Sequence, residues 1–115
     1  MAREWTPERI GEWNKKVFNR VSPQDCIGIL NHAKREMAEL IQAHNEYVVD
    51  TDDEYSKKTL SLELADMIIL MESYAYTMGI DIDESVDHKM FINENRKWKE
   101  PDEEGVIQHE PANTV

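Results

Sequence analysis

The chain has 115 residues, of which 40% are hydrophobic and 32% are charged, and this balance predicts a single soluble domain. The longest unbroken apolar run, from Met67 to Met71, is far shorter than the roughly 20 residues that cross a membrane. One cysteine, Cys26, excludes an intrachain disulfide. The net charge of −11 opposes binding to nucleic acid, and it would also repel a phosphate-bearing ligand unless a cation bridged the two.

These features lead us to expect neither nucleic acid nor a membrane as a partner. The N-terminus, Met-Ala-Arg-Glu-Trp, has no apolar signal-peptide core, so we expect a cytoplasmic protein.

The first predicted helix begins at Thr6-Pro7, where a capping residue precedes a proline at the first helical position. Apolar side chains then recur at helical spacing, at Ile10, Trp13, Val17 and Val21. A similar start signal, Ser22-Pro23 with Asp25 in a variant capping box, predicts a second helix that runs to about Tyr47. The expected apolar stripe of this second helix consists of Ile27, Leu30, Met37, Leu40, Ile41 and His44.

A polar, acidic segment from Val49 to Lys58 is predicted to be a loop. The third helix is expected from about Lys58 to Met78, with Gly79 as its stop. Asp81 and Glu84 can form a capping box for a fourth helix, which is expected to run to about Trp98. We therefore predict an all-α domain over residues 1–100, followed by a C-terminal tail over 101–115 that is mobile or docks on a partner subunit.

Two pairs of acids carry the chemical signal of this sequence. Glu36 and Glu39 share one face of the second helix, and Glu63 and Asp66 share one face of the third. The second pair lies in a segment that is otherwise almost wholly apolar, which predicts a buried helix. Because carboxylates are rarely buried unless they are paired, we predict that the four acids meet and bind a divalent cation. The alternatives are a solvated face for the first pair and buried Arg or Lys partners for the second.

The ligand types narrow the choice of metal. All-carboxylate ligation selects the hard cations Mg²⁺, Mn²⁺ or Ca²⁺. Zinc would require Cys or His ligands, and a carboxylate-bridged di-iron bundle would require two Glu-x-x-His motifs, of which this sequence has none.

A second group of polar residues follows in the fourth predicted helix. Lys89, Asn93 and Arg96 lie on one face of this helix, and Trp98 follows them. Cations clustered in an acidic protein favour contacts with phosphate oxygens. The alternative is a solvated face whose cations pair with Glu94 or Glu100.

Taken together, these motifs resemble those of the MazG-like nucleoside triphosphate pyrophosphohydrolases, an all-α superfamily. The resemblance covers roughly residues 25–98 and is strongest for the short, single-domain members of phages and bacteria. It rests on Glu36-x-x-Glu39, Glu63-x-x-Asp66 and Lys89-x-x-x-Asn93-x-x-Arg96-x-Trp98. Family members often open the first motif with two glutamates, whereas Arg35 precedes Glu36 here, so the motif does not identify the general base.

The resemblance implies a four-helix bundle that is completed by oligomerisation, as a homodimer or homotetramer. It implies hydrolysis of a nucleoside triphosphate to the monophosphate and pyrophosphate, with Mg²⁺ or Mn²⁺, two or more ions per site, as the cofactor. The metal ligands and catalytic acids would be Glu36, Glu39, Glu63 and Asp66. Lys89, Asn93 and Arg96 would contact the triphosphate or sugar.

The base remains the least determined part of the substrate. Trp5, Trp13 or Phe18 could stack on a base, and His32 could hydrogen-bond to one. Phage members of the family tend to act on deoxynucleotides, purines among them, so we expect a purine dNTP, with dGTP as the first choice, and a role in shaping the nucleotide pool. The location would be the host cytoplasm if a phage encodes the chain. The competing hypothesis is a non-catalytic helical dimerisation module whose acids are ion-paired across the interface.

Overall fold

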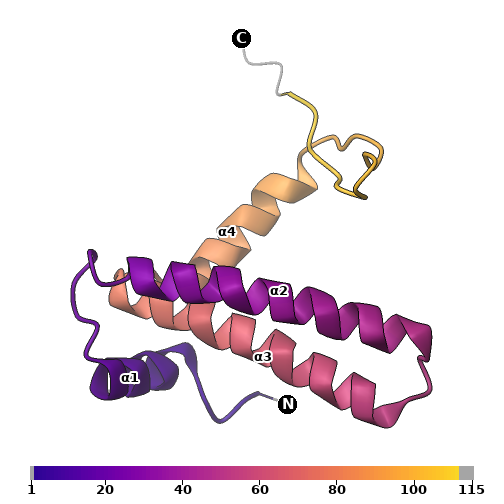
Figure 1. Ribbon diagram of the computed structural model, residues 1–115. Coiled ribbons are helices and arrows are strands. Elements are labelled where there is room, and N and C mark those ends of the chain that lie inside the picture. Colours follow the sequence, from indigo (N-terminus) through magenta and orange to yellow (C-terminus); the bar gives the residue numbers. More distant parts are fainter. Residues whose placement is uncertain (1, 112–115) are drawn as a thin grey trace. The chain divides into compact units, whose positions relative to one another are not determined.

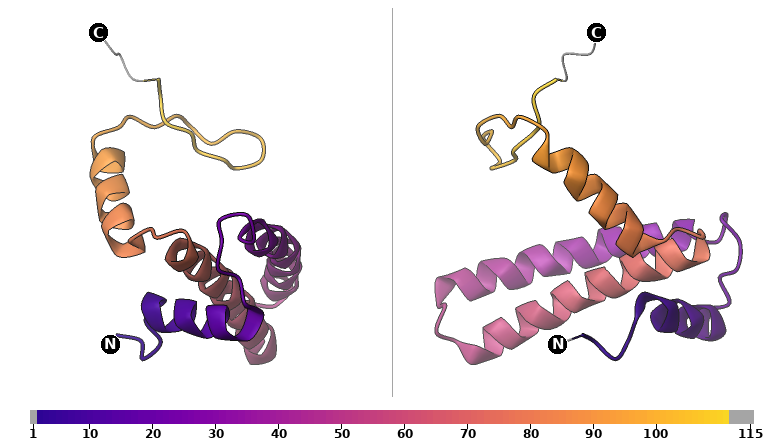
Figure 2. Two further views of the ribbon diagram at one scale, coloured as in Figure 1. Left: turned by 90° about the vertical axis from the view of Figure 1, so that its left-hand side faces the viewer. Right: turned by 180° about the vertical axis from the view of Figure 1, so that it is seen from behind.

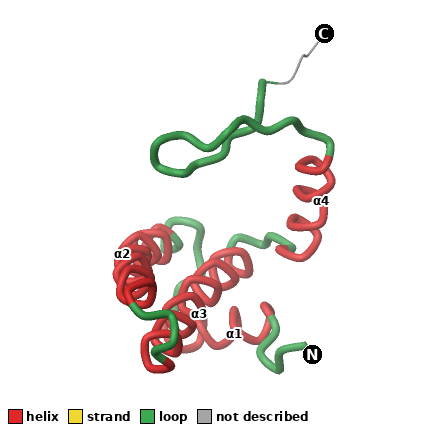
Figure 3. The backbone as a smooth tube through the Cα atoms, turned by 90° about the vertical axis from the view of Figure 1, so that its right-hand side faces the viewer, coloured by secondary structure: helices red, strands yellow, loops and turns green. Residues whose placement is uncertain are grey.

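The computed structural model describes residues 2–111, and these contain four helices and no strands. The helices are α1 (Pro7–Phe18), α2 (Ile27–Val49), α3 (Glu54–Thr77) and α4 (Ile82–Glu94), shown in Figure 1. Figure 3 shows that loops alone connect them. The predicted all-α class is confirmed. None of the helices in residues 2–111 is both long and apolar enough to cross a bilayer.

The chain divides into two compact units, one up to Ile82 and the other from Asp83 onward. This division falls at the start of α4. The boundary near residue 100 stays a prediction.

Helix α1 begins as predicted. The Thr6 hydroxyl accepts a hydrogen bond from the Arg9 backbone N–H at 3.2 Å, and Pro7 occupies the first turn. The helix ends at Asn19, whose φ of 53° is left-handed and whose N–H donates to the Lys15 carbonyl. The buried face differs from the predicted stripe, because Ile10 and Asn14 are buried while Trp13 and Val17 are exposed.

A close approach fixes α1 against α3. Gly11 faces Tyr76, and a Cβ atom at position 11 would overlap the Tyr76 side chain. Glycine is therefore required where the two helices meet. The segment before α1 is also tied to α3, because Arg3 donates two hydrogen bonds, at 2.7 and 2.9 Å, to the carboxylate of Glu72.

Helix α2 begins at Ile27, later than the predicted Ser22-Pro23 start. Residues 22–26 form tight turns instead, in which the Asp25 N–H donates to both the carbonyl and the hydroxyl of Ser22. The capping signal is thus satisfied by a turn that precedes the helix.

Helices α2 and α3 lie side by side and run in opposite directions, as Figures 1 and 2 show. The loop between them is shorter than predicted, because Asp53 caps α3 by accepting hydrogen bonds from the Tyr55 N–H at 3.0 Å and the Ser56 hydroxyl at 2.8 Å. The predicted stop at Gly79 is confirmed: its φ is 71°, and the Ile80 N–H donates to the Ala75 carbonyl at 2.8 Å.

The core of this unit lies along the α2–α3 contact. Ile29, Ala33 and Leu70 form its buried centre, with Met67, Met71 and Tyr74 packed around them. The predicted stripe of α2 is wrong as a core face, since four of its larger apolar members are exposed: Ile27, Leu30, Met37 and Ile41. Helix α2 carries apolar residues on two faces, and the buried face holds Ile29, Ala33 and Ala43.

In the second unit, α4 ends at Glu94, four residues before the predicted end at Trp98. The Asn95 side-chain amide donates to the Phe91 carbonyl at 2.7 Å, and the Trp98 indole N–H donates to the Asn93 carbonyl at 3.3 Å. These bonds satisfy carbonyls that a longer helix would have used.

Beyond α4, the chain folds back on itself. The Lys99 N–H donates to the Gln108 carbonyl at 2.8 Å, and the Glu110 N–H donates to the Lys97 carbonyl at 2.7 Å. A turn closed by Asp102 joins the two segments. Docking of residues 101–115 on a partner subunit stays a prediction, and residues 112–115 lie outside the described part of the chain.

Candidate metal centre and adjoining cavity

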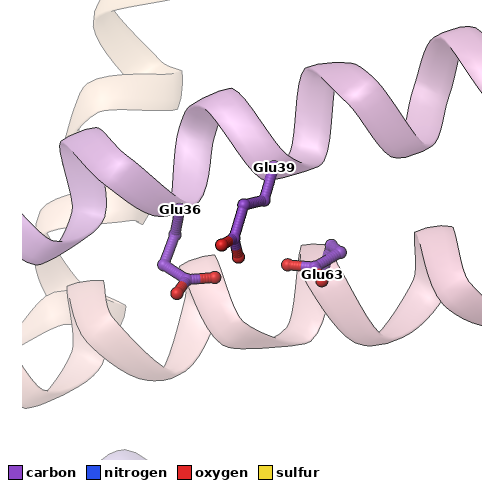
Figure 4. Close-up of side chains that lie close together, drawn as sticks. All are labelled: Glu36, Glu39 and Glu63. Atoms are coloured by element: carbon purple, nitrogen blue, oxygen red, sulfur yellow. The ribbon is translucent and has the colours of Figure 1, made fainter.

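Three of the four predicted acids meet between α2 and α3. Glu36 and Glu39 project from α2, Glu63 projects from α3, and one carboxylate oxygen from each lies within 4.8 Å of the other two. Figure 4 shows the three side chains directed into the space between the two helices. The helical spacing brings the first two together, and the antiparallel pairing of the helices adds the third.

Asp66 lies near this group without being one of its members. It is exposed, and its charge acts on both Glu39 and Glu63. The premise that α3 is buried all round is wrong: Leu62, Leu64 and Ile68 are 56%, 50% and 42% exposed. The dry environment is confined to the side of α3 that faces α2.

Two carboxylate oxygens of this cluster are buried, one on Glu36 and one on Glu63. Glu36 and Glu63 are half-buried, and the Oε2 atom of each is buried without a hydrogen-bond partner among residues 2–111. Buried polar atoms normally have a partner, and an orphaned carboxylate oxygen is costly. Two such atoms in one cluster make it a candidate ligand site.

Burial and the closeness of other acids raise the pKa values of two of the carboxyl groups, Glu39 and Glu63. A hydrogen bond with Glu36, followed by repulsion from the Glu36 charge, raises the pKa of Glu39. Loss of solvent, followed by repulsion from Glu39, Glu36 and Asp66, raises the pKa of Glu63. Glu39 and Glu63 therefore hold their protons more tightly than isolated carboxyl groups do.

No Lys or Arg forms an ion pair with any of these four acids within residues 2–111. The ion pair that touches the cluster is His32 Nε2 to Glu36 Oε1, at 3.2 Å. The alternative in which buried Arg or Lys side chains neutralise Glu63 and Asp66 therefore has no support within this part of the chain.

A cavity of about 770 Å³ adjoins the acids. It lies among α1, α2, α3 and the segment before α1. Its walls include Glu36, Asp66 and His32 on the side of the acids, and aromatic and basic side chains elsewhere: Arg3, Trp5, Trp13, Phe18 and Arg20. The rings of Trp13 and Phe18 meet edge to face with centroids 5.7 Å apart. The predicted substrate residues Trp13 and His32 thus line one cavity.

Sequence reasoning missed three polar residues of these walls, Arg3, Asn14 and Arg20. Asn14 follows Ile10 by four positions, so a polar residue on the buried face of α1 was a usable signal. Arg3 and Arg20 lie outside helices, and no periodicity could have identified them.

The predicted phosphate contacts belong to the second unit. Lys89 and Asn93 lie on α4, and Arg96 follows its end. Lys89 is exposed, whereas Asn93 and Arg96 are half-buried. Their approach to the acids stays a prediction.

Comparison with known proteins found similarity to a curated protein and to a solved structure. No protein-family model matches the chain. A curated protein of cyanophage S-2L named dATP/dGTP diphosphohydrolase is 37% identical over 51 residues, which cover 44% of this chain and 48% of that protein. The match thus spans about half the length of the curated relative.

The second similarity is to a solved structure, the MazG-like pyrophosphohydrolase of cyanophage S-2L bound to dGDP and three catalytic Mn²⁺ ions per active site. The TM-score is 0.54 at 21% identity, over 93% of this chain and 91% of the other. These matches confirm the predicted resemblance to the MazG-like pyrophosphohydrolases, and the structural match shows that the chain has their all-α fold.

Proposed function

We propose that the chain hydrolyses a nucleoside triphosphate to the monophosphate and pyrophosphate, with Mg²⁺ or Mn²⁺ as the cofactor. The observation that carries this proposal is the cluster of Glu36, Glu39 and Glu63, whose oxygens lie within 4.8 Å of one another. Two of its oxygens are buried without a partner, and no Lys or Arg of residues 2–111 neutralises it.

The residues fit a hard divalent cation. Two unit charges 4 Å apart repel by about 4 kcal/mol at an effective dielectric constant of 20, so several carboxylates at this spacing require protons or a metal. Carboxylate oxygens are the preferred ligands of Mg²⁺ and Mn²⁺. Glu36, Glu39 and Glu63 would bind the metal with Asp66, and four acids can accommodate more than one ion. The solved relative holds three Mn²⁺ ions per active site.

A bound metal would supply charge neutralisation for the phosphate oxygens and acidify a water for in-line attack. The protein supplies the other functions. Glu36 and Glu63 each present a carboxylate oxygen that lacks a protein donor. A carboxylate beside the attacking water would accept its proton.

The cavity beside the acids would receive the nucleoside. Trp13 and Phe18 offer aromatic surface for a base, and His32 and Asp66 lie on the walls nearer the metal ligands. The curated relative is named for dATP and dGTP, so we propose a purine dNTP, with dGTP first. The activity would shape a nucleotide pool, in the host cytoplasm if a phage encodes the chain. Lys89, Asn93 and Arg96 would contact the triphosphate or sugar.

A homodimer or homotetramer would complete the site. Both long helices expose large apolar side chains along their length, including Met37 and Ile41 on α2 and Leu62 and Ile68 on α3. Exposed apolar surface of this kind is typical of protein–protein contacts.

The proposal is tested by incubating the protein with a panel of NTPs and dNTPs in Mg²⁺ or Mn²⁺ and identifying the products by ion-exchange chromatography. We expect monophosphate and pyrophosphate in equal amounts, and we expect Glu63→Gln to abolish their formation. Glu12→Gln, an exposed change on α1 that removes the same charge, is the control and should retain activity. Absence of turnover with every nucleotide and both metals would favour the non-catalytic dimerisation module.

A further inference from the structure

Arg20 has a specific position on the wall of the cavity. It directly follows the left-handed Asn19 that ends α1, and its guanidinium packs against Gly28 in the first turn of α2. A Cβ atom at position 28 would lie only 3.2 Å from Arg20 Nη2, so the glycine leaves room for the guanidinium. The guanidinium carbon also lies 5.7 Å from the centre of the Phe18 ring.

This guanidinium is available for a ligand. Among residues 2–111, no carboxylate lies within ion-pair distance of Arg20. Of the two arginines on the cavity wall, Arg3 pairs with Glu72, whereas Arg20 has no such partner among the described residues. It offers up to five N–H donors in a planar fork and no acceptor.

Arg20 packs against the first turn of α2, at Gly28, whereas the proposed metal ligands of α2 lie farther along the helix. Gly28, His32 and Glu36 lie on one face of α2 at successive spacings of four residues. At a rise of 1.5 Å per residue, Gly28 and Glu36 are about 12 Å apart along the helix. A nucleotide whose phosphates occupy the acid end therefore brings its base, and not its phosphates, toward Arg20.

The chemistry of the wall distinguishes among bases. An arginine fork donates to two acceptors side by side, and guanine presents O6 and N7 in that arrangement, whereas adenine places an amino group where guanine has O6. The same cavity contains an acceptor, because Asn14 is 3% exposed and its Oδ1 has no hydrogen-bond partner among the described residues. Guanine carries N–H donors at N1 and N2, which such an acceptor can bind.

We infer that Arg20, supported by Asn14, recognises the base and selects guanine. This inference rests on the proposed hydrolysis and adds its base specificity. It differs from a phosphate-binding role for Arg20, which would act equally on all nucleoside triphosphates.

The test compares kcat/KM for dGTP, 7-deaza-dGTP and dATP in Mn²⁺, for the wild-type protein and for Arg20→Gln. The analogue 7-deaza-dGTP lacks only the N7 acceptor. We expect wild-type protein to favour dGTP over both other substrates by on the order of tenfold, and Arg20→Gln to bring the three values within about twofold of one another. Lys16→Gln, which removes the same charge from an exposed position on α1, should keep the wild-type preference.

Two further variants keep the test decisive if Arg20→Gln folds poorly. Arg20→Lys keeps the charge but not the fork, and Gly28→Ala displaces the guanidinium without altering it; both should weaken the guanine preference. Equal wild-type rates for dGTP and 7-deaza-dGTP, or an equal fall for all three substrates in Arg20→Gln, would overturn the inference.

If the wild-type protein hydrolyses none of the three substrates, that result counts against the proposed function and leaves the base preference of Arg20 untested. The inference is then decided by calorimetric binding of dGMP and 7-deaza-dGMP in Mn²⁺. Tighter binding of dGMP by wild-type protein alone would support the role of Arg20, and equal binding of the two would reject it.

Discussion

His32 Nε2 lies 3.2 Å from Glu36 Oε1, one helical turn away on α2, and this contact orients one acid of the candidate metal centre. The other oxygen of Glu36 is the buried atom without a partner. The imidazole thus holds the carboxylate so that its free oxygen faces the interior. A partner that orients a ligand contributes to metal affinity without touching the metal.

We predict that His32→Ala weakens Mn²⁺ binding by on the order of tenfold, because Glu36 loses its orienting contact. Isothermal titration calorimetry with Mn²⁺ measures the change. His44→Ala, an exposed histidine farther along α2, is the matched control and should bind Mn²⁺ as wild-type protein does. Equal Mn²⁺ affinity of wild-type protein and His32→Ala would contradict this role.

Metal removal should lower the stability of the protein. A metal that binds the assembled acids and not the unfolded chain adds about 2.7 kcal/mol at 100 times its dissociation constant. We expect Mn²⁺ to raise Tm relative to EDTA in wild-type protein and in Glu12→Gln, and the shift should be much smaller in Glu63→Gln. Differential scanning fluorimetry measures all three, and a shift of full size in Glu63→Gln would argue against Glu63 as a ligand.

The pH dependence of the metal-free protein follows from the raised pKa values of Glu39 and Glu63. The folded state favours the protonated form of these groups, so their contribution is fully present below the ordinary value of 4.5 and is lost as the pH rises through the folded pKa. The pKa values of Asp25 and Asp53 are lowered, so their contribution to stability has the opposite sign. It is present above the ordinary value of 3.8 and is lost as the pH falls through the folded pKa.

In EDTA, the free energy of unfolding should therefore fall as the pH rises from 4.5, and the fall should be smaller in Glu63→Gln. Urea denaturation at a series of pH values measures both slopes. Identical slopes for Glu63→Gln and wild-type protein would show that burial and repulsion together do not raise the pKa of Glu63.

Packing between α1 and α3 should depend on Gly11. The substitution Gly11→Ala places a methyl group against Tyr76, which we expect to cost roughly 1–3 kcal/mol of stability through overpacking. Urea denaturation measures the loss. Glu12→Ala, at the adjacent exposed position, should change stability by less than about 0.5 kcal/mol. The smaller side chain in Tyr76→Leu should recover part of the loss in a double variant, and its failure to do so would place the strain elsewhere.

Much of the local structure could be predicted from short-range signals. Thr6-Pro7 begins α1 and Gly79 ends α3, since a cap involves hydrogen bonds among residues within about four positions. The starts of α2 and α3 were predicted less well. Ser22 caps a turn instead of the helix, and Asp53, five residues before the predicted helix start at Lys58, is the cap in use.

The sequence by itself determined the four helices and the two pairs of acids, because helical periodicity places residues three positions apart on one face. Only the tertiary structure decided that Glu63 meets Glu36 and Glu39, that α2 buries Ala33 and leaves Met37 exposed, and that Asn14 and Arg20 line one cavity. Periodicity describes each helix alone, whereas these relationships depend on how closely and in which rotation two helices pack, and that is set by the volumes of side chains distant in the chain.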